Sequence, residues 1–211
     1  MERYPAPAGA PLLVLAHGAG AGERHPWMLR VARGLSANGV SVVTFEFPYM
    51  QARRKRPDHT PVLETAYRAA WEEVTRDAPT GTTFFAGGKS MGGRMASHVA
   101  AANGFVPPAA GLVFFGYPLH PPDAPAKRRD AHLPLISAPM LFIHGTRDPF
   151  GSPVEMQDLS GSLPTSRLYL VEGGDHSLQR SKRGESVDDA VGIAAAWIKT
   201  TSSMQRSSVP I

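Results

Sequence analysis

The sequence predicts an α/β protein in which helices cover both faces of a mostly parallel sheet of about six strands. Short apolar runs recur along the chain, segments of helical periodicity separate most of them, and 42% of the 211 residues are hydrophobic. That composition is enough for one core. We expect a single domain over residues 1–200 with no separate lid domain, followed by a polar tail, 201–211, that we expect to be mobile.

Six apolar runs are expected to form the strands. Val, Leu, Ile and Phe follow one another in most of these runs rather than alternating with polar residues, as in parallel strands that are buried on both faces. Such strands need crossover connections, and right-handed ones are the rule. The runs are residues 12–16, 40–47, 82–86, 112–115, 140–143 and 168–171.

Four segments between or after these runs have the spacing of amphipathic helices. Thr60 precedes Pro61, which predicts an N-cap followed by proline at the first helical position. Ser186 and Asp189 have the spacing of a capping box for the last helix. The apolar positions of the four helices fall in residues 27–35, 63–74, 91–99 and 187–198.

Composition narrows the range of functions. The chain has no cysteine, which excludes disulfides, thiolate metal sites and a cysteine nucleophile. The first residues lack the pattern of a secretory leader, and no apolar run approaches the ~18 residues of a membrane span, so we expect a cytoplasmic protein without a membrane partner. Scattered histidines without acidic neighbours at ligand spacing predict no metal site.

The net charge of +4 is concentrated in two basic runs, residues 53–56 and 127–129. No aromatic-rich basic surface accompanies them, so we expect no nucleic-acid partner. The segments 49–59 and 117–135 leave the carboxyl ends of strands and are expected to wall a pocket there. On these loops Tyr49, Arg53 and His120 are the candidate substrate-binding residues.

The sequence Gly88-Lys89-Ser90-Met91-Gly92 contains the pattern G-x-S-x-G between an expected strand and an expected helix. A serine on such a sharp turn is exposed as a nucleophile, and the flanking glycines avoid collisions with neighbouring backbone. A phosphate-binding loop is the rival interpretation, because Gly-Lys-Ser ends that motif as well. Thr83 stands where the motif requires its first glycine, which excludes it.

The acid and base expected for such a serine follow two later strands. Asp148 follows the fifth apolar run, and His176 follows the sixth within a glycine-containing turn. We expect Asp148 to orient His176, which takes the proton from Ser90. Asp175 and Glu172 lie on the same loop as the histidine and remain alternative acids.

Two backbone N–H groups are expected to form an oxyanion hole. Met91 opens the helix after the serine, and Ala19 lies in the small-residue loop after the first strand. This loop resembles a dinucleotide-binding turn, but Glu23 occupies the position where that turn requires glycine or alanine.

Five segments together resemble a known family, the small lidless α/β-hydrolases related to dienelactone hydrolase. Within it, they are most similar to bacterial relatives of a domain shared by a testis-expressed animal protein and a chromatin-complex subunit. The resemblance spans about residues 12 to 199 and implies a triad of Ser90, Asp148 and His176, with no particular substrate. The segments are HGAG at 17–20, HPWM at 25–28, GGKSMGGR at 87–94, GYPLHPP at 116–122 and GTRD at 145–148.

The function we expect is hydrolysis of an ester, thioester or related activated acyl compound through an acyl-Ser90 intermediate, with a small-molecule substrate and no cofactor. A catalytically idle interaction domain on the same scaffold is the main alternative. A nucleic-acid-associated protein that uses the basic loops is a weaker one. The sequence leaves the oligomeric state open.

Overall fold

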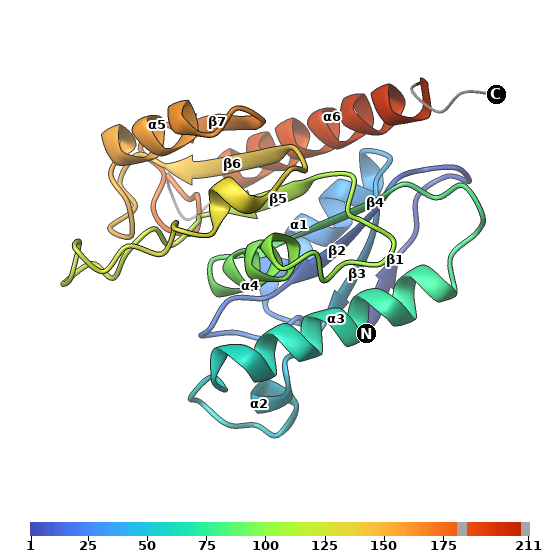
Figure 1. The fold of residues 1–211 in the computed structure, drawn as a ribbon, viewed down its shortest axis with the longest axis horizontal. Helices are drawn as coiled ribbons and strands as arrows, with labels where there is room; N and C mark the ends of the chain where they lie inside the picture. The colour runs from blue at the N-terminus through green and yellow to red at the C-terminus, as the bar shows by residue number, and fades with distance from the viewer. Residues whose placement is uncertain (181–184, 208–211) are drawn as a thin grey trace.

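The computed structural model describes residues 1–180 and 185–207. The chain alternates between strands and helices over most of this length (Figure 1). The strands are β1 (Glu2–Tyr4), β2 (Leu12–Ala16), β3 (Ser41–Phe45), β4 (Phe84–Lys89), β5 (Leu112–Phe115), β6 (Met140–Gly145) and β7 (Ser166–Val171). The helices are α1 (Pro26–Ala37), α2 (Pro48–Gln51), α3 (Thr60–Arg76), α4 (Met91–Ala101), the 3₁₀ turn η1 (Leu133–Leu135), α5 (Pro153–Ser162) and α6 (Glu185–Ser207).

The strands form one seven-stranded sheet in the order β1-β3-β2-β4-β5-β6-β7. Strands β2 to β7 pair in parallel, which confirms the predicted fold class. The seventh strand is β1, which the sequence analysis did not predict. It is only three residues long and pairs with β3 in antiparallel orientation at the edge of the sheet.

Helices cover both faces of the sheet (Figure 1). On one face, α1 and α6 pack against Leu13 and Leu15 of β2 and their neighbours. On the other face, α3, α4 and α5 pack against Val14, Phe114 and Phe142. Alternate residues of the same strands are therefore buried in different layers, which explains why the strand sequences are apolar throughout. Within the described residues, no further domain is inserted between these elements.

Two predicted helix starts differ from the structure. His59 is the N-cap of α3, and Thr60 is already helical, so the predicted Thr60 cap is wrong. Ser186 lies inside α6, where its hydroxyl donates to the carbonyl of Leu178 and accepts from the N–H of Arg180. Because this hydroxyl holds the preceding loop, the predicted capping box with Asp189 is wrong as well.

The end of the chain also differs from the expectation. We expected the polar residues after 200 to form a mobile tail, but α6 continues to Ser207. Gln205 on this last part of the helix donates to the carbonyl of Ala110 at 2.9 Å, and Arg206 donates to the carbonyl of Gly9 at 2.9 Å. These bonds tie the polar end of α6 to two loops of the domain. Residues 208–211 lie outside the described residues.

Two α-helices were missed by the sequence analysis, the four-residue α2 and the longer α5. Helix α5 lies between β6 and β7 and begins with a capping box, in which the Ser152 hydroxyl accepts from the N–H of Glu155 and the Glu155 carboxylate accepts from the N–H of Ser152. This box is the sequence signal that predicts the helix. In the parts of the chain that the structure describes, no helix is long and apolar enough to cross a membrane.

Candidate active site

Ser90 lies on a sharp turn between β4, the central strand, and α4. Its backbone is in a left-handed conformation, with φ 51° and ψ −117°, which is strained for a residue that carries a Cβ atom. The neighbouring glycines make the turn possible. A Cβ atom at Gly88 would lie 2.5 Å from the carbonyl carbon of Gly92, and one at Gly92 would lie 2.5 Å from the Ala16 carbonyl oxygen.

The structure brings Ser90, His176 and Asp148 into one chain of hydrogen bonds. The Ser90 hydroxyl lies 2.8 Å from His176 Nε2, and His176 Nδ1 lies 2.8 Å from Asp148 Oδ2. This network fits a neutral imidazole that donates from Nδ1 and accepts the serine proton at Nε2. The ring of Phe150 stacks on the imidazole with a centroid distance of 4.3 Å and holds its plane.

Asp148 is the only one of the three candidate acids that contacts the histidine ring among the described residues. Burial opposes ionisation of its carboxyl, but the hydrogen bond from His176, the electrostatic interaction with the His176 and His144 rings and the N–H of Phe150 outweigh burial and lower the pKa of Asp148. Its other oxygen accepts from the N–H of Phe150 at 2.9 Å. The carboxylate is therefore ionised and fixed at both oxygens.

The two alternative acids have other partners. Asp175 accepts from the backbone N–H groups of Ser177 and Gln179 at 2.7 and 2.9 Å, which orders the turn that carries His176. Glu172 accepts a long, 3.4 Å hydrogen bond from the hydroxyl of Thr146. None of these hydrogen bonds connects Asp175 or Glu172 to the imidazole of His176.

Two buried side chains, Tyr49 and His17, hold the loop that carries Ala19 by hydrogen bonds to its backbone carbonyl groups. Tyr49 donates from its hydroxyl to the Ala19 carbonyl at 3.0 Å. His17 accepts from the N–H of Phe47 at 3.0 Å, and its Nδ1 donates to the Gly18 carbonyl at 2.7 Å. Burial lowers the pKa of His17, so that the ring is neutral and can accept and donate at once.

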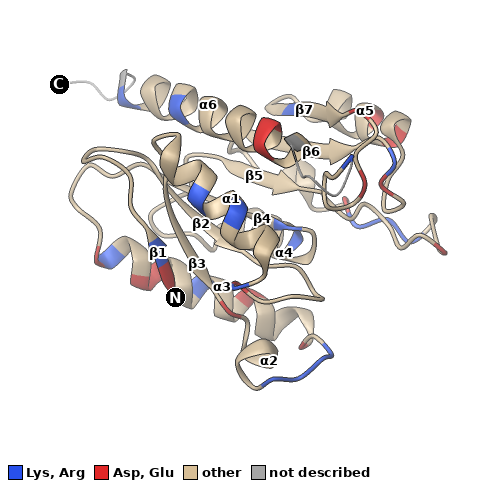
Figure 2. Ribbon diagram, turned by 180° about the vertical axis from the view of Figure 1, so that it is seen from behind, with Lys and Arg blue, Asp and Glu red and all other residues tan. Residues whose placement is uncertain are grey.

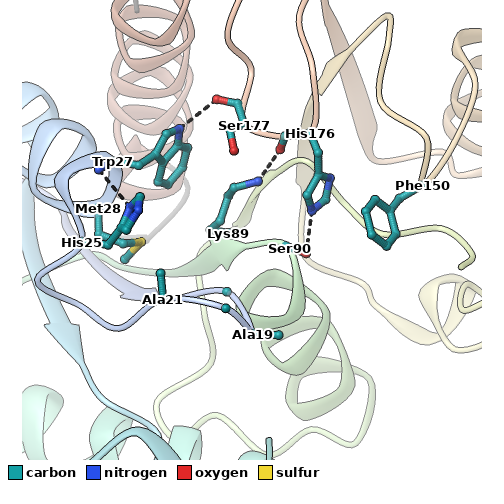
Figure 3. Close-up of a pocket in the computed structure, with 12 residues that line it drawn as sticks. Ala19, Ala21, His25, Trp27, Met28, Lys89, Ser90, Phe150, His176 and Ser177 are labelled. Atoms are coloured by element: carbon teal, nitrogen blue, oxygen red, sulfur yellow. Dashed lines mark hydrogen bonds between the residues drawn. The ribbon is translucent and has the colours of Figure 1, made fainter. Parts of the chain in front are cut away.

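A cavity of about 360 Å³ opens beside Ser90 (Figure 3). Its walls are mainly apolar, with the indole of Trp27 and the side chain of Met28 from α1 on one side and Phe150 on the other (Figure 3). The lining residues are Gly18, Ala19, Gly20, Ala21, His25, Trp27, Met28, Lys89, Ser90, Phe150, His176 and Ser177.

The three candidate substrate-binding residues do not line this cavity. Tyr49 is buried beneath the Ala19 loop, and Arg53 is exposed on the basic loop that follows α2 (Figure 2). His120 is buried, with its Nε2 3.4 Å from the Glu155 carboxylate. The expectation that loops 49–59 and 117–135 wall the pocket is therefore wrong for the cavity beside Ser90, because α1 occupies the place expected for them.

Among the cavity residues that the sequence analysis did not predict as functional, Lys89 and Trp27 make hydrogen bonds to the loop of His176. The Lys89 ammonium donates to the backbone carbonyl of His176, and Trp27 Nε1 donates to the backbone carbonyl of Ser177 at 2.8 Å. Both bonds hold the loop that carries the histidine (Figure 3). Sequence alone indicates Trp27 only as part of the apolar stripe of α1, and Lys89 only as the variable position of G-x-S-x-G.

Among residues 1–180 and 185–207, no group of three or more His, Asp or Glu side chains is arranged to hold a metal ion.

A nucleophile turn at the carboxyl end of the central strand, in a sheet of this order, defines the class of α/β-hydrolases. The chain belongs to the alpha/beta hydrolase domain family, whose model matches residues 9–203.

Solved structures agree with this fold. The chain is similar to dienelactone hydrolase from Anabaena variabilis, with 21% identity, a TM-score of 0.74, and 94% of this chain and 89% of that chain covered. A lidless α/β serine hydrolase from Xanthomonas campestris has 21% identity and a TM-score of 0.70, with 98% and 88% covered. Est1E from Butyrivibrio proteoclasticus, solved with ferulic acid, has 17% identity and a TM-score of 0.70, with 92% and 91% covered.

Proposed function

We propose that the protein is a serine hydrolase that cleaves an ester, thioester or similarly activated acyl compound through an acyl-Ser90 intermediate. The observation that carries this proposal is the hydrogen-bond chain from Ser90 through His176 to Asp148. Its geometry is that of a nucleophile, a general base and the carboxylate that fixes the tautomer of the base.

The reaction uses these groups in sequence. His176 Nε2 takes the proton of Ser90 as its oxygen attacks the acyl carbon, and the imidazolium then returns that proton to the leaving alcohol or thiol. Water attacks the acyl-enzyme with the same base, so that the products are the acid and the free serine. The N–H groups of Met91 and Ala19 stabilise the oxyanion, each by about 10² to 10³-fold in rate.

The cavity supports an acyl substrate of small to moderate size. Trp27, Met28 and Phe150 supply apolar walls of the kind that bind the carbon chain of a ligand. We further propose that the chain acts as one domain on a small molecule. The narrower kinship with the bacterial relatives of the testis-expressed protein stays a proposal, supported by the segment GGKSMGGR at 87–94.

A fluorophosphonate probe tests the proposal, because it reacts covalently with activated serines. We expect the wild-type protein to be labelled and the Ser90→Ala variant not. Ser137→Ala is the matched control, since Ser137 is exposed and lies outside the cavity. Absence of labelling in the folded wild type would contradict the proposal and favour an idle interaction domain.

A further inference from the structure

The cavity contains a lysine directly beside the nucleophile. Lys89 is the last residue of β4, its side chain is only 9% exposed, and it lines the cavity together with Ser90. Its ammonium lies 5.4 Å from the centre of the Trp27 ring and points between that ring and the histidine (Figure 3).

This ammonium has no acidic partner among the described side chains. Its hydrogen bond goes to the neutral carbonyl oxygen of His176. No carboxylate oxygen of the described residues lies within 4.0 Å of Nζ. An ammonium has three N–H donors, so two remain for a ligand. Buried charges in proteins are normally paired, and an unpaired one that faces a cavity is a site for an anion.

The burial of the ammonium also shifts the pKa of Lys89. Burial lowers it to about 8, and the more distant charges of Asp148 and Asp175 raise it without restoring the ordinary value. At neutral pH the side chain is still mostly charged. A ligand anion in contact with it regains the charge pairing that water would otherwise provide.

The exposed basic loop does not offer an equivalent site. Arg54 pairs with Asp58 at 2.7 Å, and residues 53–56 are exposed and lie outside the cavity. Exposed charges are screened by salt and contribute little to selection between ligands. Lys89 is the lysine that can select a ligand by charge at the reacting centre.

We propose that the substrate carries a carboxylate on its acyl part, close to the scissile carbonyl, and that this carboxylate pairs with the ammonium of Lys89. This inference rests on the proposed function. The ammonium acts as a single point charge, which one carboxylate balances, whereas a phosphate group with a charge of about −1.5 to −2 would leave negative charge unpaired in a mainly apolar cavity. The acyl chain between the carboxylate and the carbonyl lies against Trp27 and Met28.

The test compares two probes for Ser90. One is a short alkyl fluorophosphonate that ends in a carboxylate, and the other is the carboxamide of the same length, so that shape is nearly constant and charge differs. The second-order rate constant of labelling is measured for both over several chain lengths. We expect the carboxylate probe to react about tenfold faster or more at the best length, as a buried charge-assisted hydrogen bond allows.

Two variants assign the preference to a residue. Lys89→Met keeps the length of the side chain and removes its charge, and we expect the rate ratio to fall to about one or below. Lys55→Met removes the same charge from the exposed loop, outside the cavity, and we expect the ratio to be unchanged. A ratio that falls equally in both variants would overturn the inference in favour of general electrostatic attraction.

A pH series on the wild type gives an independent answer if Lys89→Met does not fold. Raising the pH from 7 to 9.5, through the lysine pKa of about 8, neutralises the ammonium while the probe remains a carboxylate, so the rate ratio should fall. A change of pH that alters the reactivity of Ser90 and His176 affects both probes alike, so it cancels in the ratio of the two labelling rates. The titratable groups near Lys89 are Asp148, Asp175, His144, His176 and His25.

The outcomes separate the two proposals. If both probes label Ser90 at equal rates at every chain length, the inference is overturned, but the proposal of a serine hydrolase is unaffected. Failure of both probes to label the folded protein contradicts the hydrolase and the inference together. Labelling with a preference that disappears in Lys89→Met or at high pH supports both.

Discussion

The hydroxyl of Tyr49 donates a hydrogen bond to the carbonyl oxygen of Ala19 at 3.0 Å. Tyr49 is completely buried, so its contribution is to position the loop whose N–H we propose as an oxyanion donor rather than to contact the substrate. Burial raises the pKa of Tyr49 to about 12, which keeps the hydroxyl protonated and able to donate over the whole working range of the protein.

Removal of this hydroxyl should therefore affect both stability and reactivity. We expect Tyr49→Phe to lower the free energy of unfolding by about 1 kcal/mol. Because the Ala19 loop loses an anchor, we also expect slower labelling of Ser90. Chemical denaturation and labelling kinetics measure the two effects. Tyr169→Phe is the control, since no hydrogen bond from Tyr169 to a described residue is present. Equal effects of the two variants would contradict this role.

The strained backbone of Ser90 predicts an unusual order of stabilities. We expect Ser90→Gly to be more stable than Ser90→Ala by about 0.5 to 1 kcal/mol, because glycine adopts a φ of 51° without steric cost. Both variants lack the hydroxyl, so their difference isolates the Cβ atom. At the exposed Ser137 the order should be reversed. Urea denaturation gives both comparisons, and an alanine variant at 90 more stable than the glycine variant would speak against strain.

The glycines of the turn should tolerate no side chain. Gly88→Ala places a Cβ atom 2.5 to 2.7 Å from backbone atoms of three residues, and backbone cannot move aside as a flexible side chain can. We expect a loss of about 3 kcal/mol in unfolding free energy or a failure to fold. Gly192 in α6 has open space, and Gly192→Ala should stabilise by about 0.5 to 1 kcal/mol. A well-folded Gly88→Ala protein would contradict the packing of the turn.

We expect the buried charge of Lys89 to lower the free energy of unfolding at neutral pH. The folded state lowers the pKa of Lys89 from 10.5 to about 8, so between these values the unfolded chain binds a proton that the folded chain lacks. The contribution of Lys89 to stability therefore rises as the pH rises from 8 to 10.5. We expect Lys89→Met to be more stable than wild type by about 1 to 3 kcal/mol at pH 7 and the gap to shrink by pH 10. Thermal or urea denaturation of both proteins across this range tests the sign.

The assignment of the acid can be tested by a matched pair. Asp148→Asn keeps the shape of the side chain but favours the wrong histidine tautomer, and we expect labelling or turnover to fall by about 10³ to 10⁴-fold. Asp175→Asn retains an oxygen that can accept from Ser177 and Gln179, and we expect activity close to wild type. If Asp175→Asn proves the more damaging of the two, the roles of the acids have to be exchanged.

The three candidate reacting groups follow from the sequence for a simple geometric reason. Each one stands directly after an apolar run, and parallel strands end at the same edge of a sheet. Ser90, Asp148 and His176 could therefore be expected to meet without knowledge of the loops. The sequence favoured Asp148 because it follows a strand, but it left Asp175 open as an alternative, and only the side-chain directions in the structure show which carboxylate contacts the histidine ring.

The surroundings of the site were much less predictable. Tyr49 and His120 were expected on loops beside the site, but both side chains are buried, and Tyr49 lies in the short helix α2. Trp27 has the spacing of a core residue, and nothing in that spacing shows that one edge of its ring faces a cavity. Strand β1 has too few residues for a recognisable pattern, since its pairing with β3 depends on contacts distant in the sequence.

The cavity draws its walls from separate segments, and substitutions in these segments have different consequences. Met28 belongs to α1, and its side chain lines the cavity without taking part in the hydrogen bonds with which Trp27 and Lys89 hold the loop of His176. Lys89, in contrast, is adjacent to Ser90 and donates to the backbone of the loop that carries His176. A change at Met28 can therefore alter the size of the molecules that the cavity admits, whereas a change at Lys89 alters the charge of the cavity and the support of the His176 loop together.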